Sequence, residues 1–522
     1  MKRVLTIPAL LVAYPLVAPL SAQTPTGTPG QEASKPTSPA AAPKLMSLQE
    51  AIETALKNNL QVGIAETTRD ATKANVLIEG GAFDWNLSGG VNWSRTQDAS
   101  TNQQFLGGSF VTTGSETTTQ NRSLTLGLNK PFEWGGTLNF QYQPTYRATK
   151  IGPIGTSPAN QTYLTTPPYD GTLSASYTQS LLRNFGREVA ASRLIVAENG
   201  AKIADLNYQK AIIDLVAATE SLYWDVAYAK RNLENKQGSL ALAEKQLKEN
   251  EIRVQVGTLA PIEVTSAQAA VAQRQQDIIS AEAQYLNAKD ALSRALYPQQ
   301  ARTPVEPSES PKVAPLTVDE PTAEKMALAN RVELKAAQLD LEGRQILEKA
   351  ANNRILPQLD VTVGYTGNAA NDPKLSPVNS DLTGMKYPGY NVGVAFAFPI
   401  LNKGARGSQA QARANRRAGE LTLKDAELGI VLEVRQALRN LDAAEKGVAA
   451  AEKTRIYREK NLETEQKKFE NGMSTNFFVL QRQDELDAAR SAELQAQIGY
   501  AKAVTAYEKA AGHLLEARKL SL

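Results

Sequence analysis

Residues 226–254 read VAYAKRNLENKQGSLALAEKQLKENEIRV, a stretch with an apolar residue at every seventh position. A matching heptad series lies 215 positions further along the chain. The first series is Val226, Leu233, Leu240, Leu247 and Val254, and the second is Leu441, Val448, Arg455, Leu462 and Phe469. A sustained repeat of this kind is typical of left-handed coiled coils. We expect long helices over about 187–255 and 405–470, each about 100 Å in length. The heptads alone favour a periplasmic coiled-coil protein with a structural role.

The sequence also contains runs with strict alternation of apolar and polar residues. Phe83, Trp85, Leu87, Val91 and Trp93 alternate with small polar residues, and Leu359, Val361, Val363 and Tyr365 do so in the second half. Period two predicts strands with one apolar and one polar face. The long helices are expected to use their apolar faces on each other, so lipid is the natural medium for these strands. An open sheet cannot remain in lipid, and several chains must therefore close one transmembrane β-barrel.

The pattern occurs twice, which predicts two structural repeats at 45–297 and 316–522 joined by a Pro-rich linker at 298–315. Each repeat opens with an expected capping box, Ser47–Glu50 and Thr317–Glu320. Residues 1–22 have the basic start, apolar stretch and small-residue end of a signal peptide. Residues 23–44 are rich in Pro, Ser and Thr and are expected to form a disordered leader.

Composition argues against catalysis. The chain has no Cys and a single His, His513, so thiolate sites, His metal clusters and His-based triads are excluded. We expect His513 at the surface, and we expect no cofactor and no bound metal. A net charge of +3 is too balanced for electrostatic binding of nucleic acid. Carboxylates are plentiful, but they are expected on solvated helix faces, which disfavours a glycan-cleaving enzyme.

The ordered set of motifs resembles the TolC family of outer-membrane efflux channels. The resemblance rests on the doubled element order, the two glycine-containing helix tips, and the segments LQEAIETAL at 48–56, YTQSLLRNFG at 177–186 and FAFPILNKG at 396–404. It implies a homotrimer in outer-membrane lipid, with a 12-stranded barrel continued by a periplasmic helical tunnel. It also implies a periplasmic adaptor and an inner-membrane pump as partners. Such a channel is a passive duct for drugs, metals or secreted proteins.

One part of the first repeat departs from this family. Residues 121–147 resemble an additional hairpin that turns at 132–136. If this hairpin joins the barrel, three chains would contribute 18 strands in place of 12.

The resemblance also implies two kinds of functional residue. The tips should dock the adaptor, and their residues are Val256, Gly257 and Thr258, and Asn471, Gly472 and Met473. Carboxylates just past the tips should ring the closed entrance and select cations. Glu263 keeps such an acid, whereas Phe478 and Gln481 stand where aspartates are expected. The other nearby acids are Asp484, Glu485 and Asp487.

Overall fold

The computed structural model describes residues 44–155, 157–163, 169–299, 305–311, 313–316, 318–369 and 372–520. The chain divides into two units, Met1–Ala42 and Pro43–Leu522, and the described residues all belong to the second. The predicted signal peptide and all of the predicted leader except Lys44 therefore lie outside the described residues.

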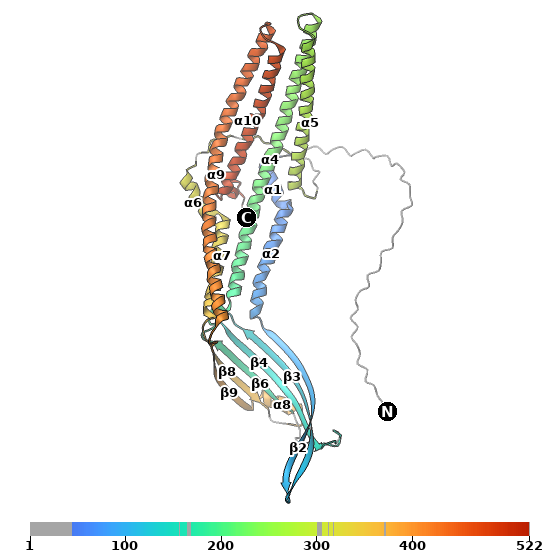
Figure 1. The fold of residues 1–522 in the computed structure, drawn as a ribbon, viewed down its shortest axis with the longest axis vertical. Coiled ribbons are helices and arrows are strands. Elements are labelled where there is room, and N and C mark those ends of the chain that lie inside the picture. Colours follow the sequence, from blue (N-terminus) through green and yellow to red (C-terminus); the bar gives the residue numbers. More distant parts are fainter. Residues whose placement is uncertain are drawn as a thin grey trace, which may run out of the picture. The chain divides into compact units, whose positions relative to one another are not determined.

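The first half of the second unit combines two short helices, a group of strands and two long helices (Figure 1). Its main elements are β1 (Lys44–Met46), α1 (Leu48–Asn58), α2 (Leu60–Gly80), a 3₁₀ turn (Gly81–Phe83), β2 (Asn86–Leu106), β3 (Ser109–Pro131), β4 (Gly136–Pro153), β5 (Thr162–Tyr163), β6 (Tyr169–Ser180), α3 (Arg187–Ala190), α4 (Ser192–Gln255) and α5 (Ile262–Leu296).

The second half runs through a similar order with fewer strands. Its elements are β7 (Val305–Pro307), α6 (Glu320–Asn330), α7 (Val332–Asn353), β8 (Gln358–Asn368), α8 (Leu375–Thr383), β9 (Tyr387–Ala397), α9 (Lys403–Glu470), α10 (Asn476–Ala510) and α11 (Leu514–Ala517). The predicted long helices are thus confirmed to within two residues at their ends, apart from a break at Ala191. None of the helices in the described ranges is both long enough and apolar enough to cross a membrane.

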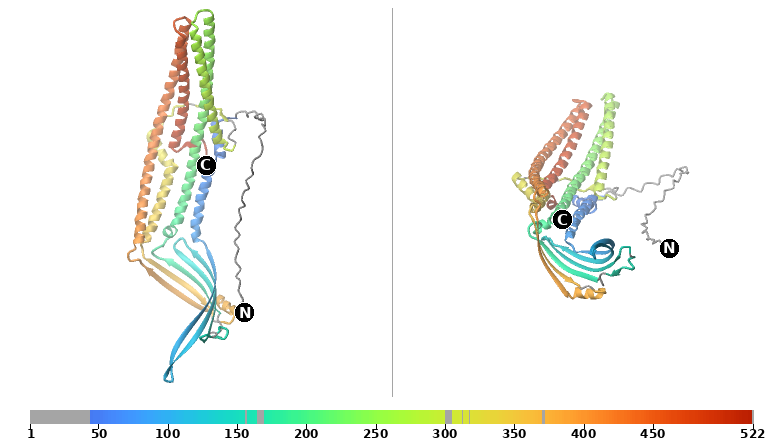
Figure 2. Two further views of the ribbon diagram at one scale, coloured as in Figure 1. Left: turned by 45° about the vertical axis from the view of Figure 1, so that its right-hand side comes forward. Right: turned by 60° about the horizontal axis from the view of Figure 1, so that its bottom comes forward.

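Six long strands form one antiparallel sheet in the order β2-β3-β4-β6-β8-β9, with the short β5 added to β4, whereas β1 and β7 pair separately. The additional hairpin predicted at 121–147 is part of β3 and β4, and both strands are fully inside this sheet. Figure 2 shows the sheet curving as an arc where the helices end. Strands β2 and β9 are its two edges.

Helix packing follows the predicted heptads more closely in the second half than in the first. On α9, Val434, Leu441, Val448, Leu462 and Phe469 are all buried. On α4, Val226 is buried, but the later heptad positions are only half-buried. The reason is that α4 contacts α2, α5, α7 and α10, so its buried positions are divided among several faces.

Helix starts show one correct and one wrong prediction. Ser47 makes the full capping box with Glu50. The second box is wrong, because α6 starts at Glu320 with Asp319 as its cap, and the Asp319 side chain accepts from the Thr322 amide. Thr317 itself lies outside the described residues. An aspartate immediately before the first turn satisfies a free amide directly, which makes a more distant Thr unnecessary.

The linker between the halves is fastened to the helices. Its strand β7 pairs in parallel with β1. Glu306 of β7 accepts hydrogen bonds from Lys230 of α4 at 2.7 Å and from Tyr285 of α5 at 2.6 Å, and it also pairs with Lys289 at 3.3 Å. Burial alone would raise the pKa of Glu306, but these hydrogen bonds outweigh it and lower the pKa to about 2.

The single histidine is not simply a surface residue. His513 is half-buried, and its ring lies edge-on to Tyr507 with centroids 5.7 Å apart. Its position follows from the chain beyond α10 folding back, so that Leu514 is buried beside α4.

Candidate functional site

The two helix tips have the same backbone geometry. Gly257 and Gly472 adopt positive φ angles of 80° and 74°. The next residue in each tip, Thr258 or Met473, donates its amide to a carbonyl five residues earlier at 2.9 and 2.8 Å. This is the Schellman arrangement, in which glycine takes the left-handed position that ends a helix. The predicted turns are therefore confirmed as turns.

The tips expose apolar side chains to solvent. Val256, Met473 and Phe477 are 67%, 71% and 66% exposed. Beneath them, Phe469, Leu462, Val479 and Leu486 form a small buried cluster that fixes the α9–α10 hairpin. The tips are thus rigidly supported but apolar at their ends, which is a property of surfaces that bind other proteins.

The predicted entrance residues divide into those whose side chains are accessible to solvent and those whose carboxylates are paired with cations. Glu263 is half-exposed in the first turn of α5, and Phe478 and Gln481 are exposed on α10. Phe478 lies edge-on to Phe477 with ring centroids 5.6 Å apart. These side chains are available to face a pore.

The remaining acids are engaged within the chain. Asp484 pairs with the buried Arg274 of α5, and Asp487 is itself buried and pairs with Lys236 of α4. Glu485 pairs with Arg458 and Arg482, both at 2.5 Å. A carboxylate held by a cation 2.5–4 Å away contributes little net charge to a lumen. Each of these three acids therefore has a cationic partner within the described residues, although the Asp484 side chain remains exposed.

The contact between α4 and α10 contains a series of polar pairs beside apolar residues such as Val226 and Ile498, and sequence reasoning missed these pairs. We call this series the α4–α10 polar interface, and it consists of four cross-helix pairs. They are Lys236–Asp487, Asn232–Ser491 at 3.1 Å, Asp225–Lys502 at 2.6 Å and Glu220–Thr505 at 2.6 Å. A signal existed, because Asn232, Ser239 and Gln246 recur at heptad spacing beside the apolar series.

Near the tips, this part of α4 and α10 contains buried polar atoms without partners. Asn476 is fully buried, and neither atom of its side-chain amide makes a hydrogen bond to any described residue. The same holds for Nδ2 of Asn250 and Nε2 of Gln483. Each such atom costs about 1–3 kcal/mol relative to a hydrated state. The closed packing of the two hairpins is therefore destabilised by these unpaired atoms, and their hydration on separation would remove that destabilisation.

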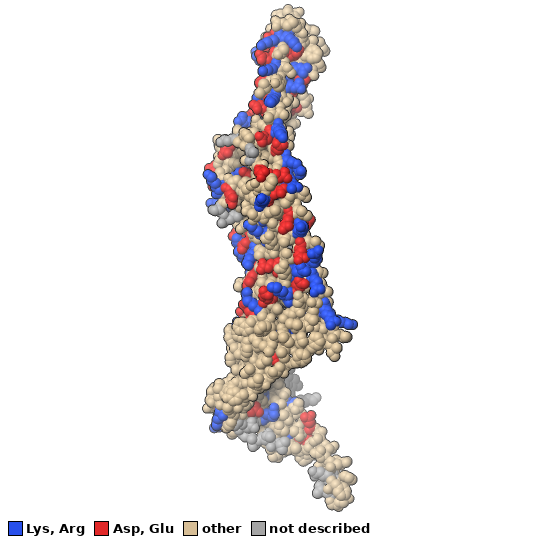
Figure 3. Space-filling view, turned by 90° about the vertical axis from the view of Figure 1, so that its left-hand side faces the viewer, with Lys and Arg blue, Asp and Glu red and all other residues tan. Residues whose placement is uncertain are grey.

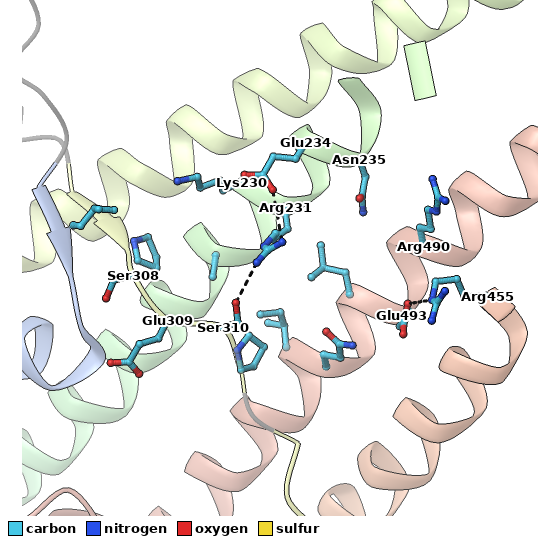
Figure 4. Close-up of a pocket in the computed structure, with 17 residues that line it drawn as sticks. Lys230, Arg231, Glu234, Asn235, Ser308, Glu309, Ser310, Arg455, Arg490 and Glu493 are labelled. Atoms are coloured by element: carbon cyan, nitrogen blue, oxygen red, sulfur yellow. Dashed lines mark hydrogen bonds and ion pairs between the residues drawn. The ribbon is translucent and has the colours of Figure 1, made fainter. Parts of the chain in front are cut away.

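A cavity of about 750 Å³ lies between α4, α10 and the linker segment (Figure 4). Arg231 reaches Ser310 at 3.3 Å on one side, and Arg455 pairs with Glu493 at 2.6 Å on the other. Lys230 and Arg490 also line it, and each has a carboxylate partner, Glu306 and Glu459. The cationic side chains of the cavity thus have acidic or hydroxyl partners, and the cavity is a gap between the hairpins lined largely by polar residues.

The sheet has one apolar and one polar face across all six long strands. Residues paired across the strands form an apolar row, Leu87, Leu128, Phe140, Ala175, Tyr365 and Tyr390. The adjacent row is polar or small, Asn86, Asn129, Asn139, Ser176, Gly364 and Asn391. The additional strands β3 and β4 therefore carry the same two faces as the others.

Aromatic residues bound the apolar face on both sides. On the helix side are Trp85 and Tyr177, and Tyr177 accepts from the Trp134 indole at 3.0 Å. On the far side one row contains Trp93, Tyr146 and Tyr169. Figure 3 shows acids and bases spread over the helices and almost none over the adjoining zone of the sheet. Among the described residues, those of α8 cover the outer part of this face, where Val378 and Leu382 are buried and α8 contacts β6. An uncharged band between aromatic girdles is the pattern of membrane-embedded strands.

Comparison with known proteins agrees with this geometry. The family described as outer membrane efflux protein matches residues 160–296 and 324–513, more than half of the chain. Outer membrane protein TolC of Vibrio cholerae is 26% identical over 325 residues, which cover 62% of this chain and 73% of TolC.

Two solved structures share the fold. The CmeC outer membrane channel of Campylobacter jejuni superposes with a TM-score of 0.62 at 15% identity, covering 90% of this chain and 86% of CmeC. The outer membrane protein VceC of Vibrio cholerae gives 0.61 at 15% identity, covering 89% and 96%. The chain therefore belongs to the outer membrane efflux protein family, and it is a TolC-type channel protein of the outer membrane with a periplasmic helical extension, not an enzyme.

Proposed function

We propose that three copies of this chain form a passive export channel through the outer membrane. The observation that carries this proposal is the six-stranded sheet with two open edges, β2 and β9, and an apolar outer face. In hydrocarbon the unpaired amides and carbonyls of an edge strand must find partners. Pairing β2 of one copy with β9 of the next satisfies both edges and closes a barrel.

The same proposal gives the number of strands in the barrel and the residues that line its lumen. Three copies of six long strands would make a barrel of 18 strands, in place of the 12 that the family resemblance implies. Barrel diameter grows roughly linearly with strand number, so this barrel would be about half again as wide. The lumen rows are mostly Asn, Ser, Thr and Gly, with Asp170 and Asp360 among them, and such polar rows suit hydrated cargo. Selection among drugs, metals or secreted proteins would then rest with the inner-membrane pump.

Opening of the helical part would use the α4–α10 polar interface. The four polar pairs of this interface can exchange their partners for water, and the unpaired amides of Asn476 and Asn250 gain water when the helices separate. A periplasmic adaptor bound at the apolar tips could supply the force for this movement. We read the two halves as an internal duplication, so that each copy offers two such tips.

The channel is tested with the purified full chain in detergent and in planar bilayers. Native mass spectrometry should show a trimer, and reconstitution should give ion-conducting events. A stable monomer, or a trimer that never conducts, would contradict the proposal.

A further inference from the structure

The outward face of the sheet carries two arginines just beyond its outer aromatic row. Arg122 stands in that row, paired across β2 and β3 with Trp93 and across β4 with Tyr146. Arg95 lies two residues beyond Trp93 on β2, and its cross-strand partner is Gln120. Because side chains alternate along a strand, Arg95, Arg122 and Trp93 share one face.

The two arginines are close enough to act together. They are diagonal neighbours on adjacent antiparallel strands, an arrangement that places their Cα atoms about 7–8 Å apart. Both side chains are exposed. The Arg122 guanidinium lies over the Tyr146 ring, 5.3 Å from its centroid, and is thereby directed towards β4. We call Arg95 and Arg122 the outer basic pair.

Within the described part of the chain, neither arginine makes an ion pair or a side-chain hydrogen bond. The contrast is with Lys130 at the opposite aromatic row, whose ammonium donates to the Phe83 carbonyl oxygen and lies 5.9 Å from the Trp85 ring centroid. These two guanidinium groups are therefore free to accept an anion, and the planar guanidinium matches carboxylate and phosphate groups bidentately.

The height of the pair places it at the outer headgroup level. Trp85, which directly precedes β2, and Trp93 on β2 are eight residues apart, about 27 Å of extended chain. At a strand tilt of about 40° this spans about 20 Å across the membrane, close to the height of the apolar band of such barrels. Arg95 and Arg122 therefore lie where lipid headgroups begin, on the side away from the helices and hence from the periplasm.

We propose that the outer basic pair binds the phosphate of a phosphorylated glycolipid in the outer leaflet. Two diagonal guanidinium groups can each donate a bidentate pair of hydrogen bonds to phosphate oxygens, while Tyr146 and Trp93 contact the sugar or upper acyl region. Both arginines precede residue 160, where the match to the family begins, and Arg122 belongs to the additional hairpin at 121–147. The proposal rests on these strands spanning the outer membrane as proposed above.

The test compares the full chain with R95Q/R122Q, both purified as oligomers, and uses bis-phosphorylated lipid A as the probe in mixed micelles. The parent should bind lipid A at least about tenfold more tightly than the double variant, since a hydrogen bond to a charged group contributes about 1.5–3 kcal/mol. Dephosphorylated lipid A should bind both proteins equally weakly.

The matched control is Arg147→Gln. Arg147 pairs with Asn121 at nearly the same height, is exposed, and lies on the lumen face of β4. It should bind lipid A like the parent. Equal binding by parent and R95Q/R122Q, equal binding of the dephosphorylated lipid by the parent, or an equal loss in R147Q would each overturn the site. Conductance measured on the same samples separates this failure from failure of the channel.

Discussion

Asn476 is the residue whose environment fits its chemistry least well. It is fully buried between helices, yet its amide lacks a partner among the described residues. Asn476→Leu keeps the volume and removes the unpaired polar atoms. We expect the free energy of unfolding to rise by about 1–3 kcal/mol and spontaneous opening in bilayers to become rarer.

Denaturant unfolding followed by helical circular dichroism measures the first effect, and single-channel recording measures the second. Gln481→Leu is the control, because Gln481 is exposed on the same helix. Its stability should change by less than about 0.5 kcal/mol. A destabilised Asn476→Leu protein would show that the amide makes a partner in the assembled channel.

Glu263 and Phe478 carry the prediction about the entrance. Glu263 has no ion pair to any described residue, so three copies would bring three free carboxylates together, and Phe478 is exposed nearby. Glu263→Gln should lower cation preference, and Phe478→Ala should raise resting conductance because an apolar ring gates by dewetting. Reversal potentials in a salt gradient and single-channel conductance measure the two effects. If both variants behave like the parent, the gate lies elsewhere.

Sequence reasoning could locate the entrance residues on the helices, but it could not identify the ion-pair partners of the acids. The 215-residue offset identified Glu263 and Phe478 as equivalent positions from the sequence alone. It could not show that Asp484 meets Arg274 or that Asp487 meets Lys236, because these contacts join positions more than 200 residues apart. Partner choice between helices depends on rotation about the helix axis, which a heptad repeat specifies only for one face.

At the scale of elements, the two tips offer a direct test of docking. Thr258 and Met473 occupy the same position in the two Schellman turns and are exposed. Thr258→Arg with Met473→Arg should leave the trimer intact and abolish export, because an apolar docking surface would receive a charge. Drug accumulation in cells and trimer abundance in membranes measure the two outcomes.

Thr258→Ser with Met473→Leu is the matched control and should export normally. Undiminished export by the arginine variant would remove the docking assignment. The tips also illustrate what a short motif can reveal, since Gly257 and Gly472 predicted left-handed turns correctly from sequence.

The linker strand β7 makes part of the stability depend on pH. The pKa of Glu306 is lowered to about 2 from its ordinary 4.5. Its stabilisation is therefore fully present above pH 4.5 and is lost as the pH falls towards 2. Glu306→Gln should lower the free energy of unfolding at pH 7 by about 2–3 kcal/mol and should remove this part of the acid dependence.

Unfolding curves between pH 2 and 7 check this expectation. Glu309→Gln, in the same segment, should follow the parent, because the Glu309 carboxylate makes no ion pair to the described residues. An unchanged acid dependence in Glu306→Gln would mean that other carboxylates dominate. The sequence indicated only a Pro-rich linker here, because a three-residue strand and its ion pairs depend on distant chain segments.

At the scale of the whole molecule, the proposed 18-stranded barrel requires the outward face of β3 and β4 to lie against lipid. Phe140→Arg should cost about 2–4 kcal/mol if the outward face of β4 lies in hydrocarbon, and it should sharply reduce the yield of membrane-inserted trimer. Asn139→Arg, one residue away on the lumen face, should assemble normally. Trimer yield in outer-membrane fractions measures both.

Equal yields for the two variants would exclude β3 and β4 from the barrel and restore a 12-stranded one. Sequence analysis recognised the additional hairpin but could not place it in the sheet. Alternation shows that a strand has two different faces, but it does not show which strands pair with it. The paired rows of the sheet supply that information.

The alternation along these strands also has a consequence for how the chain reaches its membrane. Between the two aromatic rows, each outward apolar residue, such as Leu87, Phe140 or Val392, is followed by a small or polar neighbour on the other face of the sheet. A strand in transit through the inner membrane thus presents only isolated apolar side chains, whereas arrest there requires about 20 consecutive ones. The face that holds the folded protein in lipid comes into being only when strands pair. The unpaired segment can therefore cross the inner membrane without arrest, and the paired strands then insert into the outer membrane through their shared apolar face.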